Sequence, residues 1–240
     1  MASSTPAAVA VIPAAGRGHR MGTTTPKQFL ELQHVPLLAH TLRAFESADS
    51  IAAVIVVAPA ADLPFCQRDI VDRHGFKKVR KLVPGGAERQ DSVRHGVEHV
   101  EEAYDVIVVH DAVRPFVTPA MIDEAVSSAR RHRAAIVAIP MRDTVKRVGA
   151  QGLIEQTVDR QALWLAQTPQ AFERALLQEA HRKAHLEGVR GTDDAQLVER
   201  LGVPVAIVEG SSENIKVTRP EDLAMGEAIL AARRSVSRKP

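Results

Sequence analysis

The stretch VAVIPAAGRGHRMGTTTPK, which runs from Val9 to Lys27, joins a short apolar strand to a glycine-rich loop. Glycine allows the backbone to lie against a ligand and leaves its N–H groups free to bind phosphate oxygens. The loop carries three glycines and three cationic side chains, namely Gly16, Gly18, Gly22, Arg17, Arg20 and Lys27. The stretch therefore predicts a nucleoside triphosphate site at the end of the first strand.

The spacing of the glycines argues against two other phosphate-binding loops. A dinucleotide-binding loop has the spacing G-x-G-x-x-G and an acidic residue about 20 residues further on. Here the third glycine is Gly22, and the next strand ends at Ala58-Pro59-Ala60 without an acid. A P-loop requires a lysine directly after its last glycine, and none follows Gly22.

Apolar runs and amphipathic segments alternate along the chain, which is typical of βαβ units around a parallel sheet. We expect strands at 9–12, 51–58, 78–83, 106–110, 134–139 and 203–208, and helices at 37–48, 61–74, 90–100, 119–132, 172–187, 194–201 and 220–233. Short β-like pieces around Gly149 and Gly152 indicate a hairpin within 141–167. The fold class predicted is α/β, with a Rossmann-like, mostly parallel sheet, helices on both faces and a β-hairpin arm, in a single domain over residues 1–240.

Composition excludes several classes of protein. The 240 residues include 31 basic and 29 acidic side chains, and this balance, with few aromatics, gives no case for nucleic-acid binding. The longest apolar stretch, residues 51–61, is too short to span a membrane. Cys66 is the single cysteine and is expected to be a half-buried helix residue in a reducing compartment. We therefore expect a cytoplasmic protein.

Further motifs occur in order along the chain, and it is their combination that is specific. PAAGxGxRM at Pro13–Met21 and PKQ at 26–28 are followed by GGAERQDSV (85–93), VVHDAVRPFV (108–117), RDTVKR (142–147), TVDRQALWLAQTPQAF (157–172), GTDDAQLVE (191–199) and ENIKVTRPEDL (213–223). From about Val9 to about Ile229, the chain resembles the 2-C-methyl-D-erythritol 4-phosphate cytidylyltransferases of the non-mevalonate isoprenoid pathway.

The resemblance implies that the phosphate of methylerythritol phosphate attacks the α-phosphorus of CTP and pyrophosphate leaves. Cationic side chains stabilise the charge on the phosphoryl oxygens in such a transfer, and the resemblance assigns this work to Arg20, Lys27, Arg160 and Lys216. Mg²⁺ is expected to bind mainly through the CTP phosphates. Asp111 would lie near the metal or the sugar hydroxyls, or merely cap the next turn. Another polyol phosphate, such as ribitol 5-phosphate, or a non-catalytic nucleotide-binding regulator, remains an alternative.

The resemblance also divides the site residues between the two substrates. The nucleotide-binding set is Ala14, Ala15, Gly16, Gly18, Gly85, Gly86, Ala87, Ser92 and Asp111. The set for the polyol phosphate is Asp111, Arg114, Thr144, Arg160, Thr168, Thr192 and Lys216. Family members commonly carry aspartate where this chain has Ala87. In the family, a dimerisation arm, here about 141–168, crosses to a partner subunit, so a homodimer is expected.

Several other residues are given structural interpretations. His181 and His185 have the i, i+4 spacing of metal ligands on a helix, but no glutamate follows His181, and a surface pair is expected. His110, beside a strand end, is expected to be structural. The basic run at 130–133 is expected to complement a helix C-terminus, and Trp164 is expected to pack within the arm.

Overall fold

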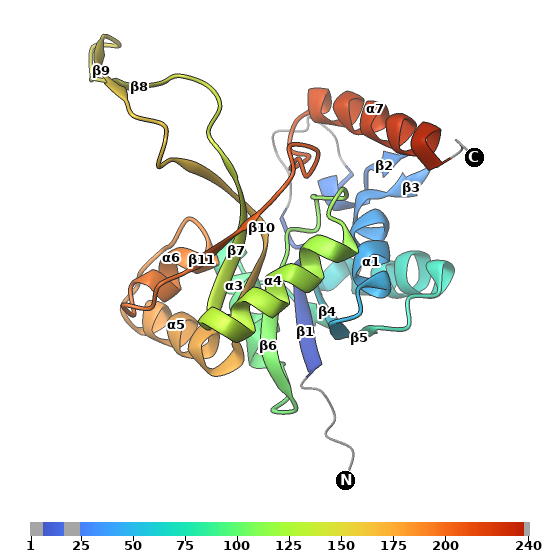
Figure 1. Ribbon diagram of the computed structural model, residues 1–240. Helices are drawn as coiled ribbons and strands as arrows, with labels where there is room; N and C mark the ends of the chain where they lie inside the picture. The colour runs from blue at the N-terminus through green and yellow to red at the C-terminus, as the bar shows by residue number, and fades with distance from the viewer. Residues whose placement is uncertain (1–6, 17–24, 238–240) are drawn as a thin grey trace.

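The structure is a computed structural model that describes residues 7–16 and 25–237 (Figure 1). Gly18 and Arg20, both predicted site residues, lie outside the described residues. The core is a seven-stranded sheet with the order β11-β7-β10-β6-β1-β4-β5. Its strands are β1 (Ala7–Pro13), β4 (Ile51–Ala58), β5 (Val79–Pro84), β6 (Tyr104–Val109), β7 (Ala134–Pro140), β10 (Trp164–Glu173) and β11 (Ala206–Glu209).

The sheet is mostly parallel, as predicted. β10 is the exception: it runs antiparallel to both β6 and β7 and lies between them. The sequence pattern predicts a hairpin that ends at 167 and a helix from Phe172, but β10 extends to Glu173 and α5 (Arg174–Leu186) begins after it. The register pairs Gln170 with Val109, so Thr168 comes to lie opposite Asp111.

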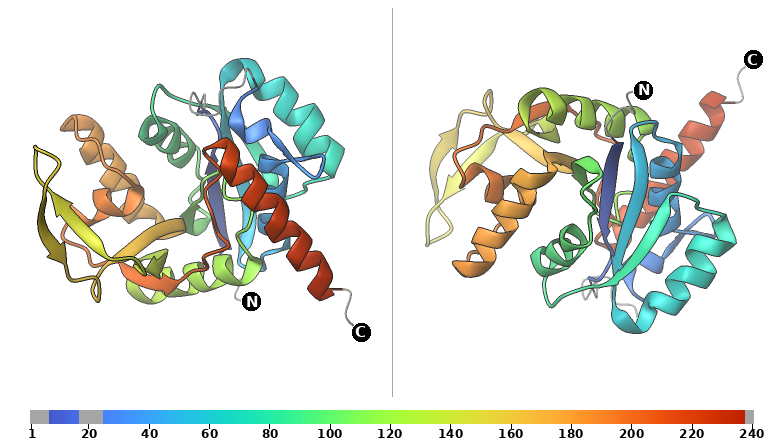
Figure 2. Two further views of the ribbon diagram at one scale, coloured as in Figure 1. Left: turned by 90° about the horizontal axis from the view of Figure 1, so that it is seen from above. Right: turned by 90° about the horizontal axis from the view of Figure 1, so that it is seen from below.

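Helices cover both faces of the sheet (Figures 1 and 2). Successive residues of a strand point to opposite faces, and β1 follows this rule with apolar residues on both sides. Ala8, Ala10 and Ile12 pack into one cluster with α1 (Leu37–Ser47) and α4 (Pro119–His132). Val9 and Val11 pack into the other with α3 (Arg89–Glu98), α5 and α6 (Asp194–Glu199). Residues on both faces are therefore buried, as parallel strands require.

Smaller elements surround this core. The 3₁₀ helix η2 (Lys27–Phe29) precedes a short hairpin of β2 (Glu31–Leu32) and β3 (Val35–Pro36), against which α7 (Pro220–Ser237) packs. Between β4 and β5 the chain forms η3 (Ala60–Asp62), α2 (Leu63–Phe65) and a π-helix, η4 (Cys66–Asp72). Cys66 is fully buried, not half-buried as expected, because its turn packs into the apolar cluster under α1. Burial raises the pKa of its thiol to about 12.

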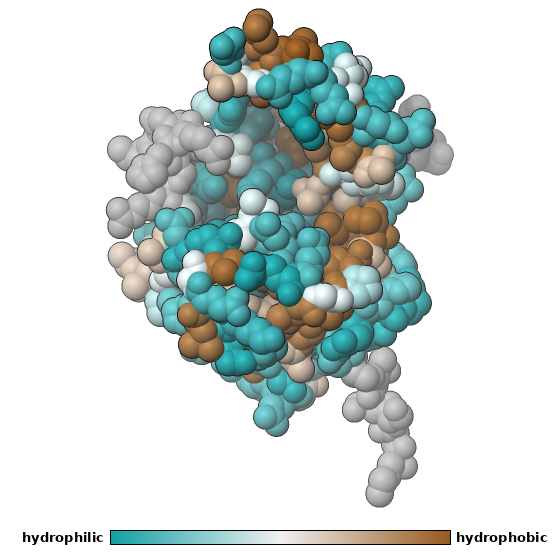
Figure 3. Space-filling view, turned by 90° about the vertical axis from the view of Figure 1, so that its left-hand side faces the viewer, coloured by the Kyte–Doolittle hydropathy of each residue, from teal (hydrophilic) through white to brown (hydrophobic). Residues whose placement is uncertain are grey.

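A two-stranded hairpin of β8 (Val145–Val148) and β9 (Ile154–Val158) projects away from the sheet (Figure 1). We call residues 141–163 the arm. In Figure 3 hydrophobic side chains gather at its tip. Val148, Leu153 and Ile154 are more than half exposed there, so the arm contributes little to the core of this chain.

Candidate active site

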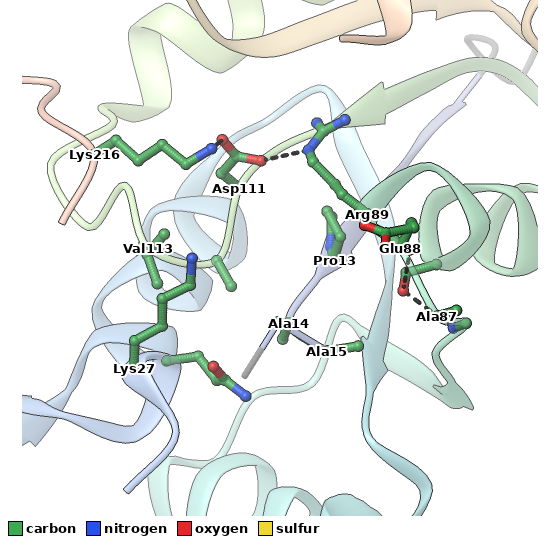
Figure 4. A pocket seen from close by; sticks show the side chains of 15 residues that line it. Pro13, Ala14, Ala15, Lys27, Ala87, Glu88, Arg89, Asp111, Val113 and Lys216 are labelled. Carbon is green, nitrogen blue, oxygen red and sulfur yellow. Dashed lines mark hydrogen bonds and ion pairs between the residues drawn. The ribbon is translucent and has the colours of Figure 1, made fainter. Parts of the chain in front are cut away.

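A pocket of about 650 Å³ opens at the edge of the sheet where the parallel strands end (Figure 4). Four segments that are far apart in the sequence line it. They are the turn after β1 with η2, the loop between β5 and α3, the turn after β6, and the segment that carries Lys216. The lining residues are Pro13, Ala14, Ala15, Gly16, Lys27, Gln28, Gly86, Ala87, Glu88, Arg89, Ser92, Asp111, Ala112, Val113 and Lys216.

Most of the predicted nucleotide-binding residues therefore lie around one pocket. The small residues allow two loops to pack tightly: a Cβ on Gly85 would lie 2.3 Å from the Cβ of Ala15. Ser92 is 2% exposed; its hydroxyl donates to the Glu88 carbonyl (3.1 Å) and accepts from the Gly86 N–H (3.1 Å). In this structure the hydroxyl of Ser92 thus fixes the shape of the loop.

Asp111 lies at the centre of a cluster of charges. Its Oδ1 accepts from Nε of Arg89 at 2.9 Å, and its Oδ2 lies 2.7 Å from Nζ of Lys216. Arg114 lies 3.8 Å from the same carboxylate. Figure 4 shows Arg89 and Lys216 reaching Asp111 from opposite sides, with Lys27 in the same pocket. Burial alone would raise the pKa of Asp111, but Arg89 and Lys216 lower it well below its usual range, so the carboxyl is ionised.

The cluster continues away from the pocket through Arg89. Its Nη1 donates to Oδ2 of Asp194 at 2.9 Å, and Oδ1 of Asp194 lies 3.0 Å from Nε2 of His181. Asp194 and His181 are each 1% exposed. The expectation of a surface histidine pair is therefore wrong for His181, whose face of α5 packs on α6, while His185 is exposed.

Sequence reasoning assigned no role to Arg89, Asp194 or Gln28. Arg89 and Asp194 stand inside the GGAERQDSV and GTDDAQLVE motifs, so the motifs carried the signal although their pairing could not be read from them. Gln28 lies within PKQ, directly after Lys27, and is 1% exposed at the pocket wall.

Lys216 is held in place by its neighbours. Asn214 is fully buried and donates to the Thr168 carbonyl (2.9 Å), and the N–H of Val217 donates to the Val113 carbonyl (2.8 Å). Arg114 donates to the Asn214 carbonyl at 2.8 Å. Arg114 and Thr168 thus do not line the pocket themselves but brace the groups that do.

Three predicted residues for the second substrate lie apart from this pocket. Thr144 and Arg160 are exposed on the arm, where Arg160 donates to the Arg142 carbonyl. Thr192 is exposed before α6, and its N–H donates to Gln196 at 2.7 Å. The fold of this chain does not bring these three residues into the pocket of Asp111.

The described residues offer limited means of holding a metal directly. Residues 7–16 and 25–237 contain no group of three or more His, Cys, Asp or Glu side chains suited to a metal ion. Both oxygens of Asp111 are already paired with cations. Asp111 alone is consistent with an ion that takes most of its ligands from a bound phosphate and water.

The basic run at 130–133 lies at the C-terminal end of α4. In the basic run at 130–133, three arginines form ion pairs with carboxylates: Arg130 with Asp105, Arg131 with Glu124 and Arg133 with Glu173. The run forms the last turn of α4, as predicted.

Among the described helices, none is long and apolar enough to cross a membrane.

The chain matches known proteins over nearly its whole length. The family model for 2-C-methyl-D-erythritol 4-phosphate cytidylyltransferase matches residues 8–232. Curated enzymes of that name from Geobacter metallireducens and Syntrophus aciditrophicus are 50% and 47% identical over 227 and 225 residues, covering 93% and 94% of this chain and 97% and 96% of the relatives.

Solved structures agree with this match. The 4-diphosphocytidyl-2C-methyl-D-erythritol synthase of Anaerococcus prevotii superimposes with a TM-score of 0.84 at 28% identity, covering 94% of this chain and 96% of that one. The cytidylyltransferase of Thermus thermophilus gives 0.76 at 36% identity, covering 92% and 98%. Sequence, fold and the convergence of the motifs on one pocket lead to the same conclusion: this chain belongs to the 2-C-methyl-D-erythritol 4-phosphate cytidylyltransferase family.

Proposed function

We propose that this protein transfers the cytidylyl group of CTP to 2-C-methyl-D-erythritol 4-phosphate and releases pyrophosphate. The observation that carries the proposal is the gathering of Lys27, Arg89 and Lys216 around one pocket at the carboxyl ends of parallel strands. Ligands of open α/β sheets bind at that edge. Ala14, Ala15 and Gly16 line the same pocket, and we expect them to lie against the nucleotide.

The chemistry requires that two phosphate groups approach each other. The phosphate of the acceptor attacks the α-phosphorus of CTP, a P–O bond forms, and the bond to the β-phosphate breaks. Charge spreads over the phosphoryl oxygens, so fixed cations lower the barrier. Lys27 lies beside the turn after β1: a Cβ added to Gly16 would lie 3.8 Å from Nζ of Lys27. Lys216 lines the same pocket from the segment before α7, so both amines can contact the reacting phosphates.

The loop that follows β5 is the proposed cytosine site. Gly86, Ala87 and Ser92 line the pocket there, and the close contact between Gly85 and Ala15 keeps the space small. A small space favours a pyrimidine over a purine. Ala87 offers only main-chain polar groups, so in this chain recognition at that position would rest on the backbone.

Mg²⁺ is the proposed cofactor, bound chiefly through the triphosphate. When bound, it would neutralise charge on the phosphates that the enzyme brings together. Asp111 would be the carboxylate that contributes a ligand, in addition to its contacts with Arg89 and Lys216.

We also propose a homodimer in which the arm packs against a second copy. Support comes from the exposed apolar residues of the arm and of the start of β10, namely Val148, Leu153, Ile154, Trp164 and Leu165. Such a patch is characteristic of an interface. An arm that crosses to the partner would bring Thr144 and Arg160 to the partner's pocket, which explains their distance from Asp111 within one chain. A cytoplasmic location is in keeping with the free, buried Cys66.

The test is a substrate panel. The protein is incubated with CTP, Mg²⁺ and either methylerythritol phosphate or ribitol 5-phosphate, and pyrophosphate release is measured with mass identification of the product. Faster release with methylerythritol phosphate is expected. Faster release with ribitol 5-phosphate would show that this polyol phosphate is the acceptor instead. CTP binding without release of pyrophosphate would indicate a non-catalytic regulator.

A further inference from the structure

Arg89 joins two buried carboxylates that come from different parts of the chain. Asp111 follows β6, Asp194 opens α6, and Arg89 opens α3. Asp111 is 6% exposed and Asp194 is 1% exposed. The cation between these two buried carboxylates lowers the cost of burying both charges, because an unpaired buried charge is strongly unfavourable.

Asp194 is held on both of its oxygens. An ionised carboxylate can only accept hydrogen bonds, so Nε2 of His181 must carry its proton and donate it to Oδ1 at 3.0 Å. Oδ2 accepts from Nη1 of Arg89 at 2.9 Å. The guanidinium group is planar and its donors have fixed directions. By holding Nη1, Asp194 therefore determines where Nε of Arg89 points.

That direction determines the orientation of Asp111. Nε of Arg89 holds Oδ1 at 2.9 Å, which leaves Oδ2 turned toward Lys216 at 2.7 Å. The charges of the cluster do not cancel: three cations, Arg89, Arg114 and Lys216, face two carboxylates, Asp111 and Asp194. The cluster keeps one net positive charge, which suits a pocket that takes an anionic nucleotide. Without Arg89 that net charge would vanish.

We propose that Arg89 and Asp194 act as a positioning pair, in which Asp194 orients Arg89 and Arg89 orients Asp111 and thereby Lys216 for the transfer reaction. The proposal rests on the proposed function. Asp194 is not among the residues that line the pocket, but the proposal gives it a role in turnover. His181 supports the pair from α5 by holding the second oxygen of Asp194.

Asp194→Asn is the first test, with Asp193→Asn as its matched control on the same helix. Asp193 caps α6 and accepts from Gln170, away from Arg89. Loss of a negative charge near the pocket would by itself strengthen CTP binding, whereas misplacement of Asp111 and Lys216 lowers the rate. We expect kcat to fall about tenfold or more in Asp194→Asn, with KM for CTP unchanged or lower. Asp193→Asn should keep kcat within about twofold, and wild-type kcat in Asp194→Asn would overturn the proposal.

Two variants of Arg89 separate charge from geometry. Arg89→Lys keeps the charge but cannot hold both carboxylates in one plane, and it should lose most of kcat. The double variant Arg89→Met with Asp194→Leu removes both partners, so it should regain the thermal stability that Arg89→Met loses, without regaining kcat. If Arg89 and Asp194 served only to stabilise the fold, the double variant would regain activity together with stability. That result would contradict the proposal.

Crystal structures of the wild type and Asp194→Asn provide a readout that does not need activity. The proposal expects the carboxylate of Asp111 to rotate and its contact with Lys216 to lengthen. An unchanged Asp111 in the folded variant would overturn it. If the wild-type protein transfers cytidylyl groups to no polyol phosphate, the proposed function fails, while these structures still decide whether Asp194 positions Asp111.

Discussion

Oγ1 of Thr168, on β10, lies 3.0 Å from Nδ1 of His110, at the end of β6. The same hydroxyl oxygen accepts from the N–H of Asp111 at 3.1 Å, so its single proton is available for Nδ1. Nε2 of His110 lies 3.2 Å from the Arg114 carbonyl and must carry a proton to bond with it. The network thus assigns a neutral His110 with its proton on Nε2. Protonation of Nδ1 would place its N–H against the hydroxyl proton of Thr168. The Thr168 hydroxyl would then have to rotate, which would disturb its hydrogen bond with the N–H of Asp111.

Stability should therefore fall in mild acid because of His110. Burial lowers the pKa of His110 from 6.5 to about 4. Because the folded-state pKa is the lower one, the stabilising contribution is complete above pH 6.5 and is lost as the pH falls toward 4. The shift corresponds to about 3 kcal/mol, at about 1.4 kcal/mol per pKa unit. Urea unfolding of His110→Gln between pH 7 and pH 4 should show a weaker pH dependence than the wild type. His185→Gln, on the surface, should keep the wild-type slope, and an unchanged slope in His110→Gln would contradict the assignment.

Lys27→Ala should lower kcat by about 10²-fold or more, because a fixed cation beside the transferred phosphate is lost. The lysine extends into the pocket, and its removal leaves the core intact, so thermal melting should match the wild type. The exposed Lys183 on α5 provides a control for loss of a positive charge. Steady-state kinetics with CTP and methylerythritol phosphate measure the effect, and an unchanged kcat would remove Lys27 from the mechanism.

The family, the α/β class and most of the pocket could be predicted from the sequence, because the features that determine them lie within short segments of the chain. β1 alternates apolar residues toward two helical layers, and the turn that follows it carries its small residues within one short motif. Because parallel strands end at one edge, motifs that follow different strands had to meet there. The placing of Ala15, Asp111 and Lys216 around one pocket follows from this rule.

The features that sequence reasoning missed depend on contacts between distant residues. Arg89 and Asp194 are 105 positions apart, and nothing in either motif indicates that they pair. The sequence indicates a surface pair for His181 and His185, but the packing of α5 on α6 buries His181. The direction of β10 could not be predicted either, because it depends on how β10 pairs with β6 and β7, which are distant in the sequence. Arg20 and Gly18 lie outside the described residues, so their roles stay predictions.

Gly85→Ala should weaken CTP binding. The added Cβ would lie 2.3 Å from the Cβ of Ala15 and 3.0 Å from Oγ of Ser92, so the loop after β5 must move away from the turn after β1. We expect KM for CTP to rise about tenfold, in line with a displaced binding loop. Ala15→Gly in the same chain removes the nearer of the two atoms and should recover part of the loss. If the double variant binds CTP no better than Gly85→Ala, the clash with Ala15 is not the cause.

Arg160 provides the sharpest test of the proposed dimer. Arg160→Ala should raise KM for the polyol phosphate and leave KM for CTP near the wild-type value, because a guanidinium binds a phosphate through two parallel hydrogen bonds. If the arm serves the partner's pocket, mixing Arg160→Ala subunits with Lys27→Ala subunits should restore activity. In a mixed dimer, the pocket that keeps Lys27 receives Arg160 from the other subunit, and the second pocket lacks both.

Random pairing at equal concentrations would make half of the dimers mixed, each with one complete pocket. At a polyol phosphate concentration far below the KM of Arg160→Ala, about a quarter of the wild-type rate is therefore expected when subunits exchange freely. The experiment compares the mixture before and after exchange through mild denaturant, with each variant treated alone as the control. Light scattering measures the mass of every sample. If Arg160 serves the pocket of its own subunit, the mixed dimers will be no more active than the average of the two parent variants. A monomer with full activity would contradict the proposed dimer itself.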